Sequence, residues 1–220
     1  MGTRRILDTA CHFRLIKIIL LCTLTLFLFS CSPIPKIIVL HDPLIADEHL
    51  SLGLSYESNG EFDIAIKEYK KALNKDRKDH RPLYYLGNAY YKKREYENAE
   101  KFYIKALDIA QDNSDIRNNI SWLYIDTDRF EDALKEIYIA LTIKTDPNYL
   151  DTLANIYYKI GKYDEAIKTL QDAMSITPPS DTNLLYNEYR LLGDAYEKMG
   201  RITASKEARE KAEEYRKDVQ

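Results

Sequence analysis

A pattern of small and apolar residues occurs in five successive copies along residues 46 to 219. The segments LGLSY, LGNAY, ISWLY, LANIY and LGDAY begin at residues 52, 86, 120, 153 and 192. Their second residues are small and lie 34, 34, 33 and 39 positions apart, and a tyrosine follows three positions later in every copy. Within each interval the apolar positions are three or four apart, which is the spacing of one helix face. The pattern therefore predicts five pairs of amphipathic helices.

Two further columns of small residues lie twelve and nineteen positions after the first one. Their members are Ala65, Ala99, Ala133, Ala166 and Ser205, then Ala72, Ala106, Ala140, Ala173 and Ala212. Small side chains let neighbouring helices approach closely, while Tyr56 and Tyr69 fill the space between the helices of a pair. The turns within the pairs hold Gly60, Arg94, Asp128, Gly161 and Gly200. A left-handed backbone, which glycine adopts most easily, is expected at the three glycines, whereas the turns with Arg94 and Asp128 have to be tolerated in another way.

These columns resemble the tetratricopeptide repeat, a helix-turn-helix unit of about 34 residues, over about residues 46 to 219. The resemblance implies an all-α solenoid of about five repeats that follows a right-handed superhelix. The repeats are expected at 46–79, 80–113, 114–146, 147–180 and 181–220, and the last one ends in a polar capping helix. The recurring tyrosines, Tyr56, Tyr90, Tyr124, Tyr157 and Tyr196, are expected in the core.

The N-terminal segment has the layout of a signal peptide: basic residues, an apolar run from Ile18 to Phe29, and a small Ser30. The run is shorter than the roughly 20 residues of a membrane-spanning helix. Residues 1–30 are therefore interpreted as a cleaved signal and residues 31–45, with three prolines, as an extended tether. The alternative is an uncleaved single-pass anchor.

Residues Leu28-Phe29-Ser30-Cys31 resemble the bacterial lipobox, although Phe29 replaces the small residue usual before Ser30. The resemblance implies that Cys31 is acylated and becomes the first residue, and two or three acyl chains would make membrane attachment permanent. Ser32 in place of aspartate implies the outer membrane, facing the periplasm. An incidental cysteine near an ordinary cleavage site is the alternative.

Charge and cysteine content exclude two classes of protein. The full chain has 32 basic and 35 acidic residues, and without residues 1–30, which hold four and one of them, 28 and 34 remain, a net charge of −6. A nucleic-acid binder would be basic, because cationic side chains neutralise phosphates. The three cysteines, at positions 11, 22 and 31, leave no disulfide for the repeats.

No constellation of catalytic or metal-binding residues follows from the sequence. The four histidines are scattered, and after Cys31 we find no cysteine nucleophile, serine elbow or glycine-rich phosphate loop. We therefore expect no enzyme, no cofactor, no metal and no small-molecule substrate.

In the tetratricopeptide family, the first helix of each repeat lines a concave groove. The groove positions hold Asn88, Trp122, Asn155, Tyr84, Tyr91, Asn118, Asp151, Tyr158, Arg190 and Asp194. An asparagine amide both donates and accepts, so it can hold the backbone of an extended peptide, and the aromatic residues offer contact area. The alternative is that Trp122 is a packed helix residue and that the asparagines face water.

A clamp for a C-terminal carboxylate, known in this family, is not expected. Leu50 and Leu54 stand where its first lysine and asparagine belong, and Asp115 and Asn119 stand where its cations belong. The sequence thus predicts a membrane-anchored, non-catalytic scaffold that holds a protein or peptide partner, for assembly of an envelope complex. The alternative is a structural protein that associates with itself, since Tyr84, Tyr85 and Tyr91 are available for pairing.

Overall fold

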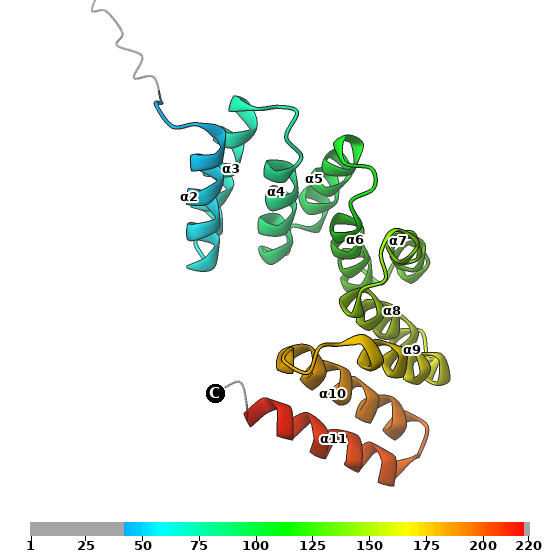
Figure 1. Ribbon diagram of the computed structural model, residues 1–220. Coiled ribbons are helices and arrows are strands. Elements are labelled where there is room, and N and C mark those ends of the chain that lie inside the picture. Colours follow the sequence, from blue (N-terminus) through cyan, green and yellow to red (C-terminus); the bar gives the residue numbers. More distant parts are fainter. Residues whose placement is uncertain (1–41, 218–220) are drawn as a thin grey trace, which may run out of the picture. The chain divides into compact units, whose positions relative to one another are not determined.

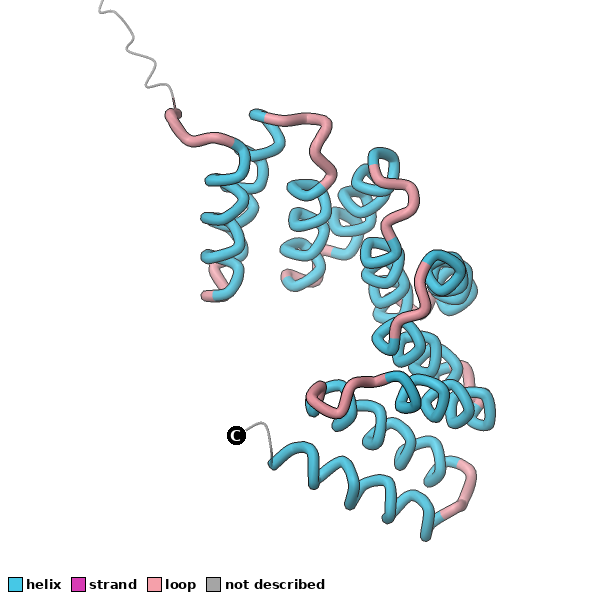
Figure 2. The backbone as a smooth tube through the Cα atoms, in the orientation of Figure 1, coloured by secondary structure: helices cyan, strands magenta, loops and turns pink. Residues whose placement is uncertain are grey.

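The computed structural model describes residues 42–217, and within this range the chain forms ten helices and no strand (Figure 1). The helices are α2 (Ala46–Ser58), α3 (Phe62–Lys75), α4 (Arg81–Lys92), α5 (Tyr96–Ile109), α6 (Ser114–Asp126), α7 (Phe130–Ile143), α8 (Pro147–Lys159), α9 (Tyr163–Ile176), α10 (Thr182–Lys198) and α11 (Ile202–Lys217). Short loops join them (Figure 2). The expected signal segment and Cys31 lie outside the described residues.

Successive helices pack in pairs, α2 with α3 through to α10 with α11, and the second helix of each pair also contacts the first helix of the next. The first helices α4, α6, α8 and α10 contact one another in the same order. We call the surface formed by α2, α4, α6, α8 and α10 the first-helix face. The all-α solenoid of five helix-turn-helix repeats is confirmed. Among the described residues, every helix is too short or too polar to cross a membrane.

Each first helix carries a small residue, from the column that begins with Gly53, at its closest approach to the second helix of the pair. Which small residue stands there follows from the large side chain that faces it. A Cβ atom on Gly87 would lie 2.4 Å from Cδ1 of Tyr103, and one on Gly53 would lie 2.3 Å from Cε1 of Tyr69. In the third and fourth pairs the equivalent large residues are the aliphatic Ile137 and Leu170. There the small positions hold Ser121 and Ala154. In the first two pairs, glycine therefore occurs where a tyrosine ring lies on the opposing backbone, while in the fifth pair Gly193 faces the Arg209 side chain.

The recurring tyrosines are less buried than the sequence predicts. Tyr124 is buried, with 8% of its surface exposed, whereas Tyr56, Tyr90, Tyr157 and Tyr196 are half-buried and pack against the edges of the core. The fully buried tyrosines of the first two pairs are instead Tyr69 and Tyr103, on the second helices. Several of these hydroxyls have side-chain partners near the surface. The Tyr124 hydroxyl donates to Glu100, that of Tyr157 bonds to Tyr138, and that of Tyr90 accepts from Lys70.

All five turns within the pairs adopt a left-handed backbone, which the sequence predicts for the three glycines only. The φ angles are +77° at Gly60, +80° at Gly161 and +74° at Gly200. Arg94 and Asp128 adopt the same conformation, with φ of 60° and 56°, despite their side chains. This conformation costs a non-glycine residue roughly 1–2 kcal/mol, so packing of the flanking helices imposes it on these two turns.

The last two pairs have the ends that the sequence predicts. Pro147 is the first residue of α8, and the Asp181 side chain caps α10 by accepting a hydrogen bond from the Leu184 backbone N–H at 3.1 Å. On α11, Ala208 and Ala212 are buried, while most of its remaining described side chains are exposed and polar. The solenoid therefore ends in a polar helix, as a stack of repeats requires.

Candidate functional site

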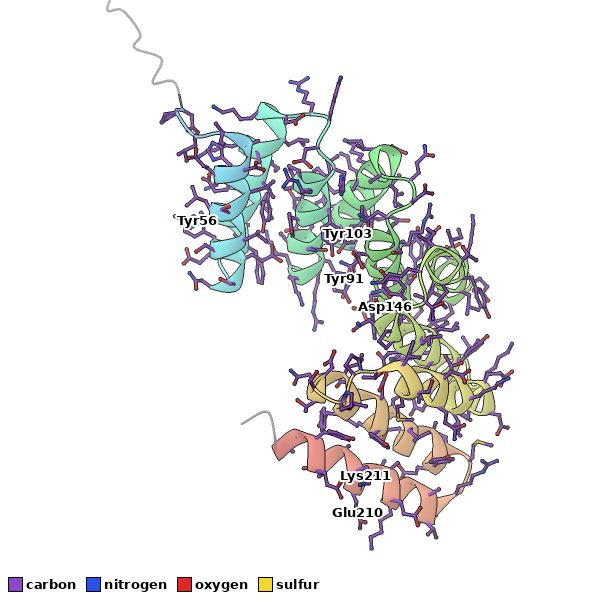
Figure 3. The ribbon with its side chains drawn as sticks, viewed as in Figure 1. Tyr56, Tyr91, Tyr103, Asp146, Glu210 and Lys211 are labelled. Atoms are coloured by element: carbon purple, nitrogen blue, oxygen red, sulfur yellow. The ribbon has the colours of Figure 1, made fainter. Side chains whose placement is uncertain are left out.

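A cavity of about 340 Å³ opens on the first-helix face between α2, α4 and α6. It is lined by Glu57, Asn88, Tyr91, Lys92, Tyr103, Asn119 and Trp122, and we call it the amide cavity. Tyr91 and Tyr103 are labelled in Figure 3, where α4 and α6 approach each other. Three predicted groove residues, Asn88, Tyr91 and Trp122, thus come together at one place. A cavity of this size holds one or two side chains of a partner.

A larger hollow, of about 750 Å³, lies along α11. Apart from Glu197, all its lining residues come from that single helix, and most are charged and exposed. It is therefore the side of the terminal helix and not a recess between packed elements. The amide cavity, built from four helices, is the better candidate site.

A hydrogen-bond network of neutral groups forms the floor of the amide cavity. The Tyr103 hydroxyl donates to Asn88 Oδ1 at 2.8 Å, and Asn119 Nδ2 donates to the same oxygen at 2.9 Å. Asn119 Nδ2 also donates to the Tyr84 hydroxyl at 3.0 Å. These bonds fix the orientation of both amides. Asn88 Nδ2 has two N–H groups, of which at most one bonds to Tyr84, and none of these bonds uses Asn119 Oδ1. A donor and an acceptor therefore remain available.

The rim of the cavity is aromatic on one side and carries opposite charges elsewhere. The Tyr91 hydroxyl donates to Asp126 Oδ2 at 2.6 Å, and Trp122 is half-buried against the core. Burial and the Asp126 carboxylate raise the pKa of Tyr91 above its ordinary value, so its hydroxyl stays protonated and its ring stays in place. Glu57 accepts a hydrogen bond from the Tyr69 hydroxyl at 2.6 Å, while Lys92 is exposed.

Tyr84, on α4, supports the floor of the cavity through its bond to Asn119. The remaining predicted groove residues lie along α6, α8 and α10, apart from the lining of this cavity. Asn155 donates to its own helix, at 3.0 Å to the Asp151 carbonyl and 3.2 Å to the Asp151 Oδ2 atom. Asn118 is half-buried, and its Oδ1 atom is buried without a hydrogen-bond partner among the described residues. The Asp151 side chain is also buried, with 9% of the residue surface exposed. Asp151 is therefore not open to a partner in the way expected of a groove residue, and Asn155 is bonded to its own helix.

The last three predicted groove residues have partners of their own. The Tyr158 ring packs against Tyr163 with 5.6 Å between the ring centroids. Asp194 accepts a hydrogen bond from Arg209 at 2.9 Å and lies 3.8 Å from the Arg190 guanidinium. These contacts are local to α8–α9 and α10–α11. They orient the side chains but leave Arg190 mostly exposed.

Sequence reasoning did not assign Asn119, Tyr103, Glu57 and Lys92 to the site. In the sequence, Asn119 stands out as a departure from the carboxylate clamp and not as a groove residue, yet it bonds from α6 to Asn88 and Tyr84 on α4. Tyr103 belongs to a second helix, where the repeat pattern predicts core and gives no sign that a hydroxyl reaches the first-helix face. Asn119 could have been found as a second amide in the first turns of the third repeat.

Comparisons with known proteins agree with this architecture. A family model described as "Tetratricopeptide repeat" matches residues 40–212. The type IV pilus assembly protein PilF of Pseudomonas aeruginosa is 27% identical over 128 residues, which is 56% of this chain and 50% of that protein. A STIP1 homologue of Dictyostelium discoideum is 31% identical over 94 residues, 42% of this chain and 16% of that protein. The matched parts span half or less of these relatives.

Solved structures share the fold at low sequence identity. A crystal structure of PilW, described as a widely conserved type IV pilus biogenesis factor, superposes with a TM-score of 0.71 at 16% identity, covering 78% of each chain. A crystal structure of MamA superposes with a TM-score of 0.62 at 23% identity, covering 76% of this chain and 96% of that one.

Proposed function

Because the chain belongs to the tetratricopeptide repeat family, whose members serve as protein–protein interaction scaffolds, we propose that it is a non-catalytic adaptor that holds a partner protein on its first-helix face. The amide cavity carries this proposal. It combines an oriented donor, Asn88 Nδ2, with an oriented acceptor, Asn119 Oδ1, beside two aromatic residues. Its floor is neutral, and the charges at the rim, Glu57 and Lys92, are of opposite sign.

The ligand that fits this arrangement is an extended peptide segment. A peptide unit presents a C=O that accepts from Asn88 Nδ2 and an N–H that donates to Asn119 Oδ1. Such recognition reads the backbone and tolerates many side chains. An apolar side chain of the partner then enters beside Trp122 and Tyr91, where burying aromatic surface contributes most of the binding energy.

The adaptor hypothesis predicts that Asn88→Ala combined with Trp122→Ala abolishes partner capture. The test is crosslinked affinity capture of the full chain from membranes, with wild type, this double variant and the control Asn74→Ala/Ile104→Ala, whose residues are exposed on the second helices α3 and α5. Circular dichroism melts verify that all three are folded. Equal capture by the double variant would contradict the site, and recovery of the chain alone in every sample would favour self-association.

We further propose that the adaptor is lipid-anchored through Cys31, at the periplasmic face of the outer membrane, and serves assembly of an envelope complex. The signal-like residues 1–30 and the Leu28–Cys31 segment support the anchor. The similarity to PilF, a protein named for type IV pilus assembly, supports a role in the envelope.

Lipidation predicts a defined N-terminal peptide in the membrane fraction. Mass spectrometry is expected to find Cys31 as the first residue of this peptide. Cys31 should carry the added mass of a diacylglyceryl group, since acylation on sulfur precedes removal of the signal. A Cys31→Ser variant keeps residues 1–30, whereas Cys22→Ser behaves as wild type. An intact peptide from Met1 to Ser30 in the wild-type protein would refute the anchor.

A further inference from the structure

Two buried carboxyl groups lie close to each other where α8 packs against α10. Glu188 has no exposed surface, and Asp151 has 9%. One oxygen of each group, Glu188 Oε2 and Asp151 Oδ1, is buried with no hydrogen-bond partner among the described residues. Buried carboxylates are usually paired with cations or with several donors, because leaving a charge unpaired in the interior is costly. The arrangement does not suit two charged groups.

The contacts of Thr177 indicate where a proton resides. Its hydroxyl oxygen lies 2.9 Å from the Ala173 carbonyl oxygen and 2.8 Å from Glu188 Oε1. The hydroxyl has one proton to donate, and a carbonyl oxygen can only accept. If Glu188 is ionised, Thr177 has to share its single proton between the two oxygens, whereas a protonated Glu188 can donate to Thr177 while Thr177 donates to Ala173. Only the second arrangement makes two full hydrogen bonds. The geometry therefore favours a protonated Glu188.

Burial and the neighbouring carboxylates also favour the protonated form of Glu188. Burial and the negative charges of Asp151 on α8 and Asp181 at the start of α10 raise the pKa of Glu188 to about 7, against the effect of Thr177. Burial raises the pKa of Asp151 to about 6, against the attraction of Arg190. The charged groups of α11 face the neighbouring Tyr189, whose pKa Lys211 lowers and Glu214 raises.

We propose that Glu188 is a proton-dependent latch: it is held as a neutral acid in the folded chain, and losing its proton loosens α10 and α11 from α8 and α9. Ionisation would place a second negative charge beside Asp151 in a site with two unpartnered oxygens. α10 also carries Arg190 and Asp194, so the latch governs the C-terminal end of the first-helix face. It does not depend on the identity of any partner.

The sign of the pH dependence follows from the direction of the shift. The folded-state pKa of Glu188, about 7, lies above its ordinary value of 4.5, so the folded chain binds the proton more tightly than the unfolded chain. This stabilisation is complete below about pH 4.5 and is lost as the pH rises through about 7. Glutamine at this position is neutral at every pH and can donate to Thr177 in place of the acid.

The first test is urea unfolding of the full chain between pH 4 and pH 9. From the two pKa values, the unfolding constant of the wild type should rise on the order of a hundredfold relative to that of Glu188→Gln. The matched control is Glu207→Gln, an exposed glutamate on α11, which should follow the wild type. Parallel curves for the wild type and Glu188→Gln would overturn the proposal.

A second test uses the wild-type protein alone. Carbon-13 spectra of the side-chain carboxyl groups in the folded wild type should contain one glutamate signal that titrates near pH 7. Hydrogen exchange, corrected for the intrinsic pH effect, should lose protection first in α10 and α11 as the pH rises. If every glutamate carboxyl titrates between about pH 4 and 5, the latch does not exist, whatever the urea curves give.

Discussion

Replacing Gly87 by alanine is expected to lower the free energy of unfolding by about 2–3 kcal/mol, the cost of overpacking a filled core. The new Cβ would lie 2.4 Å from Cδ1 and 2.5 Å from Cε1 of Tyr103. The Tyr103 ring cannot move aside easily, because 1% of the residue is exposed and its hydroxyl is bonded to Asn88. Urea unfolding of the full chain measures the loss.

A compensating substitution identifies the ring as the cause. The fourth pair has Ala154 at the small position and Leu170 opposite it, so Gly87→Ala combined with Tyr103→Leu should recover stability relative to the sum of the two single changes. The control is Gly161→Ala, which meets nothing within 4 Å and is strained only by its φ of +80°. Its cost, roughly 1–2 kcal/mol, should not depend on Leu170. Additive effects at Gly87 and Tyr103 would contradict the steric explanation.

The spacing of small residues determined the fold prediction because each column has a direct physical cause. Gly87 can be read as a close approach, and Gly161 as a left-handed turn, from the sequence alone. The depth of the tyrosines could not be read in this way. Tyr90 and Tyr103 both occupy core-facing positions, yet only Tyr103 is fully buried, because a ring on the second helix covers the glycine of the first.

The candidate site was predictable at Asn88, Tyr91 and Trp122, which line the amide cavity. Their contribution to binding stays a prediction. Asp151 was assigned to the same open groove but is buried, and the last pair explains the difference. α10 has 17 residues against 13 in α8, and its first turns bury Leu184 and Glu188. A repeat pattern aligned on the shared columns does not reveal what an added turn covers.

Asn88→Asp should separate binding from folding more cleanly than any truncation. The aspartate keeps an acceptor for the Tyr103 hydroxyl and for Asn119 Nδ2, so the melting temperature should change little. It replaces Asn88 Nδ2, the donor proposed for the partner carbonyl, with a negatively charged acceptor. An unpaired polar group in an interface costs about 1–3 kcal/mol, so partner affinity should fall on the order of tenfold to a hundredfold. Titration of the partner recovered by capture measures it.

Asn119→Asp is the matched counterpart, with the opposite balance of effects. It keeps Oδ1, the proposed acceptor for the partner N–H, but removes the two donations from Nδ2 to Asn88 and Tyr84. Stability should therefore fall by about 1–3 kcal/mol. Because the introduced carboxylate faces Asn88 Oδ1, lowering the pH until it is protonated should restore part of the loss. If Asn88→Asp proved the more destabilising of the two while binding its partner normally, the assignment of donor and acceptor in the amide cavity would be wrong.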